Sequence, residues 1–290
     1  MRNKSKVFVM AGGIGNQLFI IAAGTYYSHR NNENIVFDFS RHAYGMTNHG
    51  SDVRSLNVDA SFRDQRYMYI IKTGLNRLFK CKFLEEYTSP SIGYDSALEN
   101  YIAEKQVFGY FQTFKYLQDP EVRDLMDSLH LDSTSDWFDA CSAEMRNLPT
   151  ISVHIRRGDY MSLKNSFGVL SRDYYEAAIK FTVENSATKY ARVLIFSDDI
   201  ALAQQLSCSL ETSLPIQFAE PQEGSPEESL MLMSQSNALV MSNSSFSWWA
   251  AQLGNKSKFV VCPSKWFRDM LDPEGLIPPE WHREESRWES

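Results

Sequence analysis

The sequence lacks any apolar run of about 18 residues or more, so no segment has the pattern of a membrane-spanning helix. It contains four cysteines that are widely scattered, without the paired spacing of a zinc site or a disulfide framework, and we expect free thiols. Basic residues are outnumbered, 29 Lys and Arg against 36 Asp and Glu, giving a net charge of −7. This balance argues against a nucleic-acid-binding protein. No GxxxxGK[ST] pattern is present, which argues against a P-loop kinase.

The chain has 290 residues and 43% hydrophobic residues, a globular composition long enough for about two domains. Its first residues resemble a signal peptide, because basic residues precede the apolar runs Val7–Ala11 and Leu18–Ala23. However, Gly12–Gly13 and Asn16–Gln17 interrupt the apolar stretch. A strand, a glycine turn and a helix explain the segment better, and we expect a cytoplasmic protein.

Strand and helix patterns alternate along the chain. In the first half we expect a helix over Gln17–His29, capped by Asn16, and further elements at Lys6–Ala11, Asn34–Phe39, Lys105–Phe111 and Tyr116–His130. In the second half we expect strands at Thr150–Ile155, Ala191–Phe196, Pro215–Ala219, Ala238–Met241 and Lys258–Cys262. A capping box with proline at the first helical position, Ser225–Glu228, starts one of the intervening helices.

This alternation predicts an α/β fold of parallel βαβ units. The pattern favours two Rossmann-like domains facing each other across a cleft, with a boundary near Asn147–Pro149. We therefore predict domains at residues 1–147 and 148–290. In parallel sheets, ligands bind beyond the carboxyl ends of the strands. Polar residues concentrate after each strand of the second half, and we expect these loops to converge on one rim.

The segment His154–Tyr160, with the sequence HIRRGDY, is the sharpest motif. Arg156 and Arg157 are costly to bury unless they meet an anion, and a guanidinium matches phosphate oxygens. Asp159 can orient an arginine or bind a hydroxyl. The alternative is a solvated turn with an Arg–Asp ion pair. His154 is either functional or a packed, hydrogen-bonded histidine.

A second motif, Ser242–Trp249, reads SNSSFSWW. It places hydroxyl and N–H groups at a helix N-terminus, which is a ready anion site, although plain helix capping by serine explains it too. The two tryptophans of this motif are expected in the core. Asp198 and Asp199 can bind a ribose or a base edge, or Asp198 can cap the next helix. A metal site at this pair is disfavoured, because no further carboxylate lies at ligand spacing.

The glycine loop near the N-terminus has two interpretations. Gly13 and Gly15 nearly form GxGxxG, and Asp38 ends the second expected strand, which is the layout of a dinucleotide site. However, Leu18 replaces the third glycine. An NAD(P)-dependent oxidoreductase is therefore one alternative function, and a non-catalytic nucleotide-sugar or glycan-binding module is another.

Taken together, HIRRGDY at His154–Tyr160, FSDD at Phe196–Asp199, SNSSFSWW at Ser242–Trp249 and GGIGNQ at Gly12–Gln17 resemble glycosyltransferase family 11, the bacterial and animal α-1,2-fucosyltransferases. Gly109–Gln112 and Tyr116, with Pro263 and Trp266, extend the resemblance in the same order. HIRRGDY is shared with other fucosyltransferases, whereas SNSSFSWW is more specific. After Gln17 the sequence departs from the family pattern, and residues 40–103 match nothing usable.

The resemblance implies a GT-B-like fold, with an acceptor-side N-terminal domain and a C-terminal domain that binds GDP-fucose. It implies inverting, metal-independent transfer of L-fucose to a galactoside of a surface glycan such as O-antigen, with GDP-fucose as co-substrate and no cofactor. The acceptor is an oligosaccharide ending in galactose, and a lipid-linked acceptor would bring the protein near a membrane. The resemblance also implies which residues bind the donor. Arg156 or Arg157 would bind the pyrophosphate, and Asp198 would lie near the guanosine. Ser244, Ser245 and Phe246 would line the phosphate and nucleoside site, and Gly13, Gly15 and Asn16 would lie near the reacting centre.

The chemistry gives these residues roles. Cleavage of the fucosyl–phosphate bond builds negative charge on GDP, which fixed arginines and N–H dipoles stabilise. We predict catalytic roles for Arg156, Asp159 and His154. Asp159 and Glu220, with His154 behind them, are the candidate bases for the acceptor hydroxyl.

Overall fold

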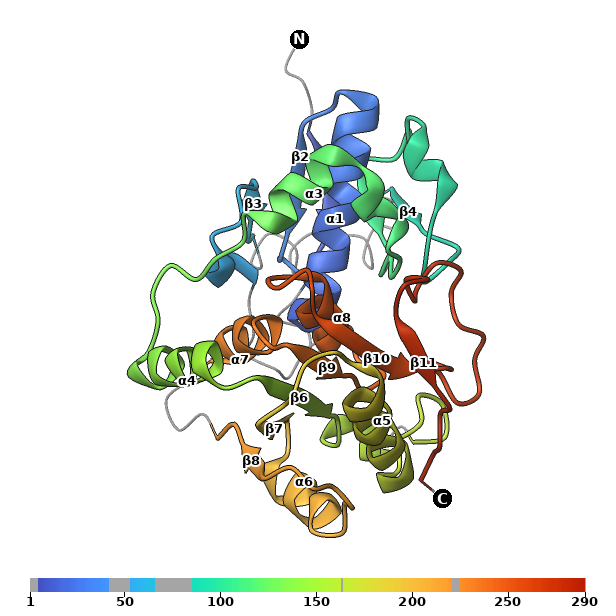
Figure 1. Ribbon diagram of the computed structural model, residues 1–290. Coiled ribbons are helices and arrows are strands. Elements are labelled where there is room, and N and C mark those ends of the chain that lie inside the picture. The colour runs from blue at the N-terminus through green and yellow to red at the C-terminus, as the bar shows by residue number, and fades with distance from the viewer. Residues whose placement is uncertain (1–4, 42–52, 66–84, 163, 221–224, 290) are drawn as a thin grey trace. The chain divides into compact units, whose positions relative to one another are not determined.

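The computed structural model describes residues 5–41, 53–65, 85–162, 164–220 and 225–289 (Figure 1). The chain divides into two compact units, one of Met1–His130 with Pro273–Ile277 and one of Leu131–Asp272 with Pro278–Ser290. The sequence places the boundary after Asn147, whereas the structure includes α4 (Asp136–Asn147) in the second unit.

Contacts with α7 (Pro226–Ser234) and its C-cap hold α4 in the second unit. The backbone N–H of Ser135, the N-cap of α4, donates to Glu228 Oε1 at 2.6 Å. The Ser142 hydroxyl donates to Gln235 Oε1 at 2.7 Å. These contacts join segments distant in sequence, so local patterns could not place the boundary.

The first unit contains a parallel five-stranded sheet in the order β3-β2-β1-β5-β4. Its strands are β1 (Lys6–Val9), β2 (Ile35–Asp38), β3 (Phe62–Arg63), β4 (Glu86–Thr88) and β5 (Gln106–Phe108). The α-helices among its described residues are α1 (Ile14–Asn31) and α3 (Pro120–Asp127), and the 3-10 helices there span Val53–Leu56, Ser96–Glu99 and Lys115–Gln118. The βαβ unit expected at the start of the sequence is confirmed.

Helix α1 begins earlier than the sequence predicts. Gly13 is its N-cap, and Asn16 lies inside the first turn, so the prediction that Asn16 caps the helix is wrong. Gly12 has a φ of +74°, which turns the chain from β1 directly into the helix. The helix is buried nearly all round, as its apolar sequence predicts.

The helix expected at Tyr116–His130 is two elements, a 3-10 helix and α3. Asp119 separates them, and its side chain accepts from the Glu121 N–H as the N-cap of α3. Pro120 follows at the first helical position, which is a common start for a helix.

The second unit contains a parallel six-stranded sheet in the order β11-β10-β9-β6-β7-β8. Its strands are β6 (Thr150–Ile155), β7 (Arg192–Ser197), β8 (Ile216–Phe218), β9 (Ala238–Val240), β10 (Phe259–Pro263) and β11 (His282–Glu284). Besides α4 and α7, its helices are α5 (Arg172–Asn185), α6 (Ile200–Ser207), α8 (Ser245–Gln252) and a 3-10 helix at Asp159–Ser162. Helices α5 and α6 lie on one face of the sheet and α7 and α8 on the other (Figure 1).

The strand order places a topological switch point between β6 and β9. From β6 the chain moves outward through β7 to β8, and then returns to the opposite side of β6 as β9. The loops after β6 and β9 therefore lead away in different directions, and open α/β sheets bind ligands at the carboxyl ends of the strands at such a point. No helix among the described residues is long and apolar enough to cross a membrane.

Candidate active site

The accessible part of the rim centres on Arg156, directly after β6. Its guanidinium donates to Asp159 Oδ1 at 2.7 Å and lies 3.2 Å from Asp198 Oδ2. The Tyr160 ring packs below it, with its centroid 5.3 Å from the guanidinium carbon. The side chain keeps 15% of its exposure. Arg156 is thus a fixed, partly accessible cation, which is what binding of an anionic ligand requires.

Asp198, at the end of β7, ties the β7 loop to the β6 loop. Its Oδ1 accepts from the Arg157 backbone N–H at 2.8 Å, while its Oδ2 faces Arg156. A Cβ on Gly158 would lie 2.3 Å from Asp198 Oδ2, so a larger residue here would require the carboxylate to move. Helix α6 is capped by Asp199, whose side chain accepts from the Leu202 N–H, and not by Asp198.

Arg157 does not join Arg156 at the rim. Its side chain is buried, its Nη1 lies 2.7 Å from Glu289 Oε1, and its Nη2 donates to the Leu170 carbonyl at 3.1 Å. The structure therefore separates the two arginines that the sequence motif presents as a pair. Arg157 anchors the segment around Leu170 and Glu289, and only its backbone reaches Asp198.

His154 and the β9 loop form the floor of the site. His154 Nδ1 shares a hydrogen bond of 2.8 Å with the Ser242 hydroxyl, and the Phe246 ring lies 5.5 Å from the imidazole. Burial, with the positive charge of Arg156 nearby, lowers the pKa of His154 to about 3. A neutral, buried imidazole is a weak proton acceptor. The geometry therefore favours a positioning role for His154 under Phe246 over its predicted catalytic one.

The N-terminus of α8 contributes the polar side of the rim. Ser244 is the N-cap, and its hydroxyl accepts from the Phe246 N–H at 3.3 Å. Ser245 and Phe246 are half-buried, whereas Ser244 is buried. Serine capping is confirmed at Ser244, whereas the anion site stays a prediction for which Ser245 is accessible at the positive end of the helix.

Asn243 and Tyr160 are structural partners that the sequence analysis did not assign. Asn243 Nδ2 donates to the carbonyls of Phe167 and Trp266, at 2.9 and 3.1 Å. The Tyr160 hydroxyl donates to the Asn243 carbonyl at 3.1 Å. Tyr160 lies in the HIRRGDY motif and Asn243 in the SNSSFSWW motif. Their position in these motifs, beside residues already assigned to the site, was the signal that could have identified them. Trp248 and Trp249 are fully buried, as expected.

The described part of the loop after β8 is tied to helix α6. Glu220 Oε1 accepts from Gln204 Nε2 at 3.1 Å, so it bonds to α6. The expected convergence is thus seen for the loops after β6, β7 and β9. Of the candidate bases, Asp159 pairs with Arg156, Glu220 bonds to α6, and His154 is buried and neutral.

In the first unit, Gly13, Gly15 and Asn16 lie at the start of α1. Gly13 is the N-cap, with no side-chain hydrogen bond at that position. The Asn16 Oδ1 accepts from Gln112 Nε2 at 2.8 Å, which joins the glycine loop to the segment after β5. The structure therefore brings together two segments of the family resemblance that lie far apart in sequence.

Asp38, which the oxidoreductase hypothesis requires, is buried and engaged. It accepts from Arg63 Nε at 3.1 Å and from the Ser40 N–H at 2.9 Å. Burial acts to raise the pKa of Asp38, but the hydrogen bonds from Arg63 and Ser40 outweigh it and lower the pKa. Asp38 thus fixes the ends of β2 and β3.

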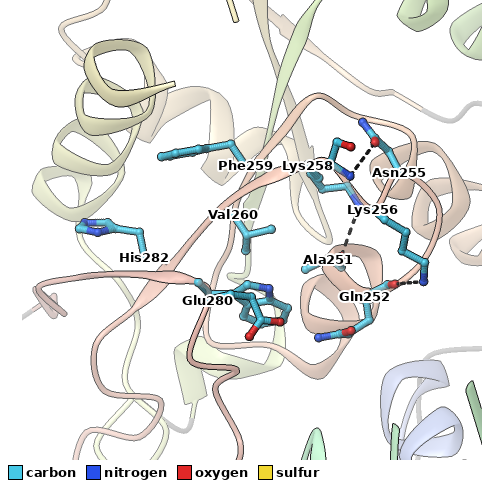
Figure 2. Close-up of a pocket in the computed structure, with 11 residues that line it drawn as sticks. Ala251, Gln252, Asn255, Lys256, Lys258, Phe259, Val260, Glu280 and His282 are labelled. Carbon is cyan, nitrogen blue, oxygen red and sulfur yellow. Dashed lines mark hydrogen bonds between the residues drawn. The ribbon is translucent and has the colours of Figure 1, made fainter. Parts of the chain in front are cut away.

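A pocket of about 370 Å³ lies at the opposite end of α8 from Ser244 (Figure 2). The ammonium of Lys258 is buried there and donates to the carbonyls of Ala250 and Leu253, at 2.9 and 3.0 Å. Burial lowers the pKa of this lysine to about 7. Lys258 thus caps the C-terminus of α8, and the pocket is separate from the rim. Among the described residues, no group of three or more His, Cys, Asp or Glu is placed to hold a metal ion.

Comparison with solved structures defines the class. A mutant of Arabidopsis thaliana FUT1 in complex with GDP is similar, with a TM-score of 0.52 and 13% identity over 95% of this chain and 74% of that one. The fucosyltransferase NodZ from Bradyrhizobium gives a TM-score of 0.51 at 13% identity, over 87% and 94%. At this identity the likeness shows the fold, which is that of GT-B glycosyltransferases. The α/β prediction is confirmed.

The family model for glycosyl transferase family 11 matches residues 53–285, and the chain belongs to that family. It is therefore a glycosyltransferase, and the oxidoreductase hypothesis is wrong. An α-1,2-colitosyltransferase of Escherichia coli is 26% identical over 94% of this chain and 97% of its own length. The O-antigen biosynthesis glycosyltransferase WbnK of Escherichia coli is 34% identical, and the galactoside 2-α-L-fucosyltransferase SEC1 of Bos taurus is 30% identical. These two alignments span 42% and 45% of this chain and only 40% and 37% of the relatives.

Proposed function

We propose that this protein transfers L-fucose from GDP-fucose to the 2-hydroxyl of a terminal galactose, with inversion at the anomeric carbon. The observation that carries the proposal is the position of Arg156. This half-buried arginine follows β6 at the switch point between β6 and β9, and the Tyr160 ring packed against it donates to the carbonyl of Asn243, the residue before the N-cap of α8. A guanidinium and a helix N-terminus at the carboxyl ends of neighbouring strands provide hydrogen-bond donors suited to a diphosphate.

The reaction breaks the bond between fucosyl C1 and the phosphate oxygen and forms a bond from C1 to the galactose oxygen. Arg156 would neutralise the charge that develops on departing GDP, as the first-turn N–H groups of α8 would. Asp198 and Asp159 hold the guanidinium from two sides, so it needs little reorganisation. Asp159 is the most exposed carboxylate of this cluster and remains a candidate to accept the hydroxyl proton.

The donor side of the proposal places guanosine near Asp198, and the phosphates near Arg156, Ser245 and Phe246. The first unit, through Gly13, Gly15 and Asn16, would approach the reacting sugar. Arg157 would support this site from behind. We propose no metal or other cofactor, and chelation with EDTA should leave turnover unchanged, whereas loss restored by a divalent cation would contradict this part.

The names of the relatives support an acceptor that ends in galactose and belongs to a surface glycan such as O-antigen. If that glycan is assembled on a lipid carrier, the enzyme works near a membrane surface. The linkage has a direct test with deoxygenated acceptors. We expect transfer to a methyl β-galactoside and to its 3-deoxy analogue, and no transfer to its 2-deoxy analogue. Transfer to the 2-deoxy analogue would contradict the α-1,2 assignment.

A second donor follows from the relative that is aligned over nearly its whole length, an α-1,2-colitosyltransferase. Colitose is L-fucose without its 3-hydroxyl. A site that hydrogen-bonds this hydroxyl rejects the deoxy sugar strongly, whereas a site that does not bind it tolerates both. We expect GDP-fucose to be the better donor by kcat/KM. A preference for GDP-colitose would keep the reaction class and overturn the donor.

A further inference from the structure

The side-chain amide of Asn16 is held from two sides in the first turn of α1. Gln112 Nε2 donates to its Oδ1 at 2.8 Å. On the other side, a Cβ on Gly12 would lie 2.4 Å from Asn16 Nδ2, so this nitrogen occupies space that exists only beside a glycine. The Gly12 carbonyl in turn accepts from Gln17 Nε2 at 3.1 Å. The Asn16 amide is thus fixed in one orientation, with Oδ1 used.

The segment that supplies Gln112 is unfavourable in two respects. Phe111 has a φ of +55°, in the left-handed region that residues with a Cβ rarely adopt. Gln112 is only 9% exposed, and its buried Oε1 has no hydrogen-bond partner among the described residues. An unpaired buried carbonyl destabilises the fold, and an apolar residue of similar length would avoid that penalty. Both features cluster at sites kept for function.

The first turn of α1 is itself a set of donors. The helix has 18 residues, its N-cap is Gly13 without a side-chain hydrogen bond, and no acidic residue lies in its first turn. Its positive end is therefore not neutralised by the side chains of that turn. Asn16 is half-buried, and its Nδ2 has no hydrogen-bond partner among the described residues. The turn suits an oxygen atom that accepts hydrogen bonds.

We propose that Gln112 is a positioning residue, which fixes the Asn16 amide so that Nδ2 donates a hydrogen bond to a sugar oxygen of the substrate. This inference rests on the proposed glycosyl transfer and adds a residue to it. The sugar oxygen belongs to either the donor or the acceptor, and kinetics with each substrate distinguish the two. The need to orient Asn16 then explains why the positive φ of Phe111 and the unpaired Oε1 of Gln112 are retained.

The test compares three variants of the full chain with the wild type. Gln112→Met removes the donor to Asn16 at similar length. Gln112→Glu keeps the size but offers a carboxylate, which would attract Asn16 Nδ2 and turn the amide round. Asn16→Asp keeps the acceptor for Gln112 and removes the donated hydrogen bond. Gln106→Met, the same substitution on β5, is the matched control. Thermal stability is measured alongside kcat and both KM values.

We expect Gln112→Met to keep or raise the melting temperature and to lower kcat/KM by roughly 10- to 100-fold, the effect of a misplaced group. Gln112→Glu should lose activity to a similar extent, and Asn16→Asp combined with Gln112→Met should lose little more than either alone. An increase in KM for the acceptor alone would show that Asn16 binds the acceptor sugar, and an increase in KM for GDP-fucose alone would show that it binds the donor sugar.

Wild-type kinetic constants for Gln112→Met, or a fall explained entirely by lost folded protein, would overturn the positioning role. Independent, multiplicative losses from the Asn16 and Gln112 variants would also overturn it. Measurements on the wild type separate the positioning role of Gln112 from the proposed glycosyl transfer on which it rests. No transfer by the wild type contradicts the proposed function and this inference together, whereas wild-type transfer matched by Gln112→Met contradicts this inference alone.

Discussion

The buried guanidinium of Arg157 lies 2.7 Å from the carboxylate of Glu289, behind the rim on which the adjacent Arg156 is partly accessible. The two arginines follow strand β6, where successive side chains point to opposite sides. Arg156 therefore lies on the rim beside Asp159 and Asp198. Arg157 packs between Glu289 and the Leu170 carbonyl. Adjacent residues of the same type thus lie in different surroundings, one partly accessible and one buried.

The first prediction concerns the ion pair between Arg157, which is buried, and Glu289, which is partly exposed. Glu289→Gln leaves the Arg157 charge without its carboxylate and should lower the free energy of unfolding by about 2 kcal/mol. The affinity for GDP should stay within twofold of wild type. Urea denaturation and titration calorimetry measure the two quantities. Glu285→Gln is the control, because Glu285 forms an exposed ion pair with Arg287 and should alter neither. Weaker GDP binding with unchanged stability would assign Arg157 to the donor site instead.

The second prediction concerns Arg156. Arg156→Ala should lower kcat by about 10²- to 10³-fold, because it removes charge stabilisation from the leaving group. Arg156→Lys should recover only part of this loss, because an ammonium lacks the planar fork. Circular dichroism should show an unchanged fold, since the side chain lies on the rim. Arg172→Ala, on an exposed surface, serves as the control. Near wild-type turnover in Arg156→Ala would remove Arg156 from the mechanism.

The third prediction tests the close approach of the β6 and β7 loops. In Gly158→Ala the new Cβ would meet Asp198 Oδ2 at 2.3 Å, so the carboxylate must move. That movement weakens its hydrogen bond from the Arg157 N–H and shifts its contact with Arg156. A displacement of about 1 Å can cost about 10²-fold in rate, and we expect kcat/KM to fall by that order. An unchanged kcat/KM would show that Asp198 does not orient the arginine.

The fourth prediction is a pH dependence of stability. Burial and the nearby Arg156 lower the pKa of His154 to about 3, whereas the unfolded chain has a pKa of about 6.5. Between these values the unfolded state binds a proton that the folded state does not. Stability should therefore fall as the pH decreases from about 6.5 towards 3, by up to about 1.4 kcal/mol per pH unit from this group.

The comparison variant for this pH dependence is His154→Asn, which keeps a polar group near the Ser242 hydroxyl. Its free energy of unfolding, measured with urea between pH 7 and 4.5, should fall less steeply than that of the wild type. The carboxylates titrate in both proteins, so the difference between the two slopes isolates His154. Equal slopes would show that the imidazole is not held neutral.

Much of the fold follows from local sequence patterns. The strand at Thr150–Ile155 and the capping box at Ser225 are predicted correctly, because apolar runs and capping residues act over a few neighbours. Short strands such as β3 (Phe62–Arg63) and β11 (His282–Glu284) are not predicted, because a strand of two or three residues is too short to show a hydrophobic periodicity. The start of α1 depends on the positive φ of Gly12, which the sequence permits but does not require.

The candidate site was predictable to the extent that it follows strand ends. Arg156, Asp198 and Ser245 lie on the rim because each follows a parallel strand at the expected edge. The separation of Arg157 from Arg156 was not predictable, because Glu289 meets Arg157 through a contact far along the chain. Likewise, no local pattern links Asn16 to Gln112, although both lie in quoted motifs.

The expectation of a free thiol at Cys81 lies outside the described residues, as do all expectations for residues 42–52 and 66–84.

The most direct test of the account is acceptor-dependent release of GDP from GDP-fucose, measured beside GDP-mannose and UDP-galactose with a panel of β-galactosides. The account predicts release from GDP-fucose that requires a galactoside, with no comparable release from the other two donors. GDP binding without any release, across the acceptor panel, would contradict transfer and favour a nucleotide-sugar-binding module. A failure to bind GDP at all would contradict the role assigned to Arg156 and the N-terminus of α8.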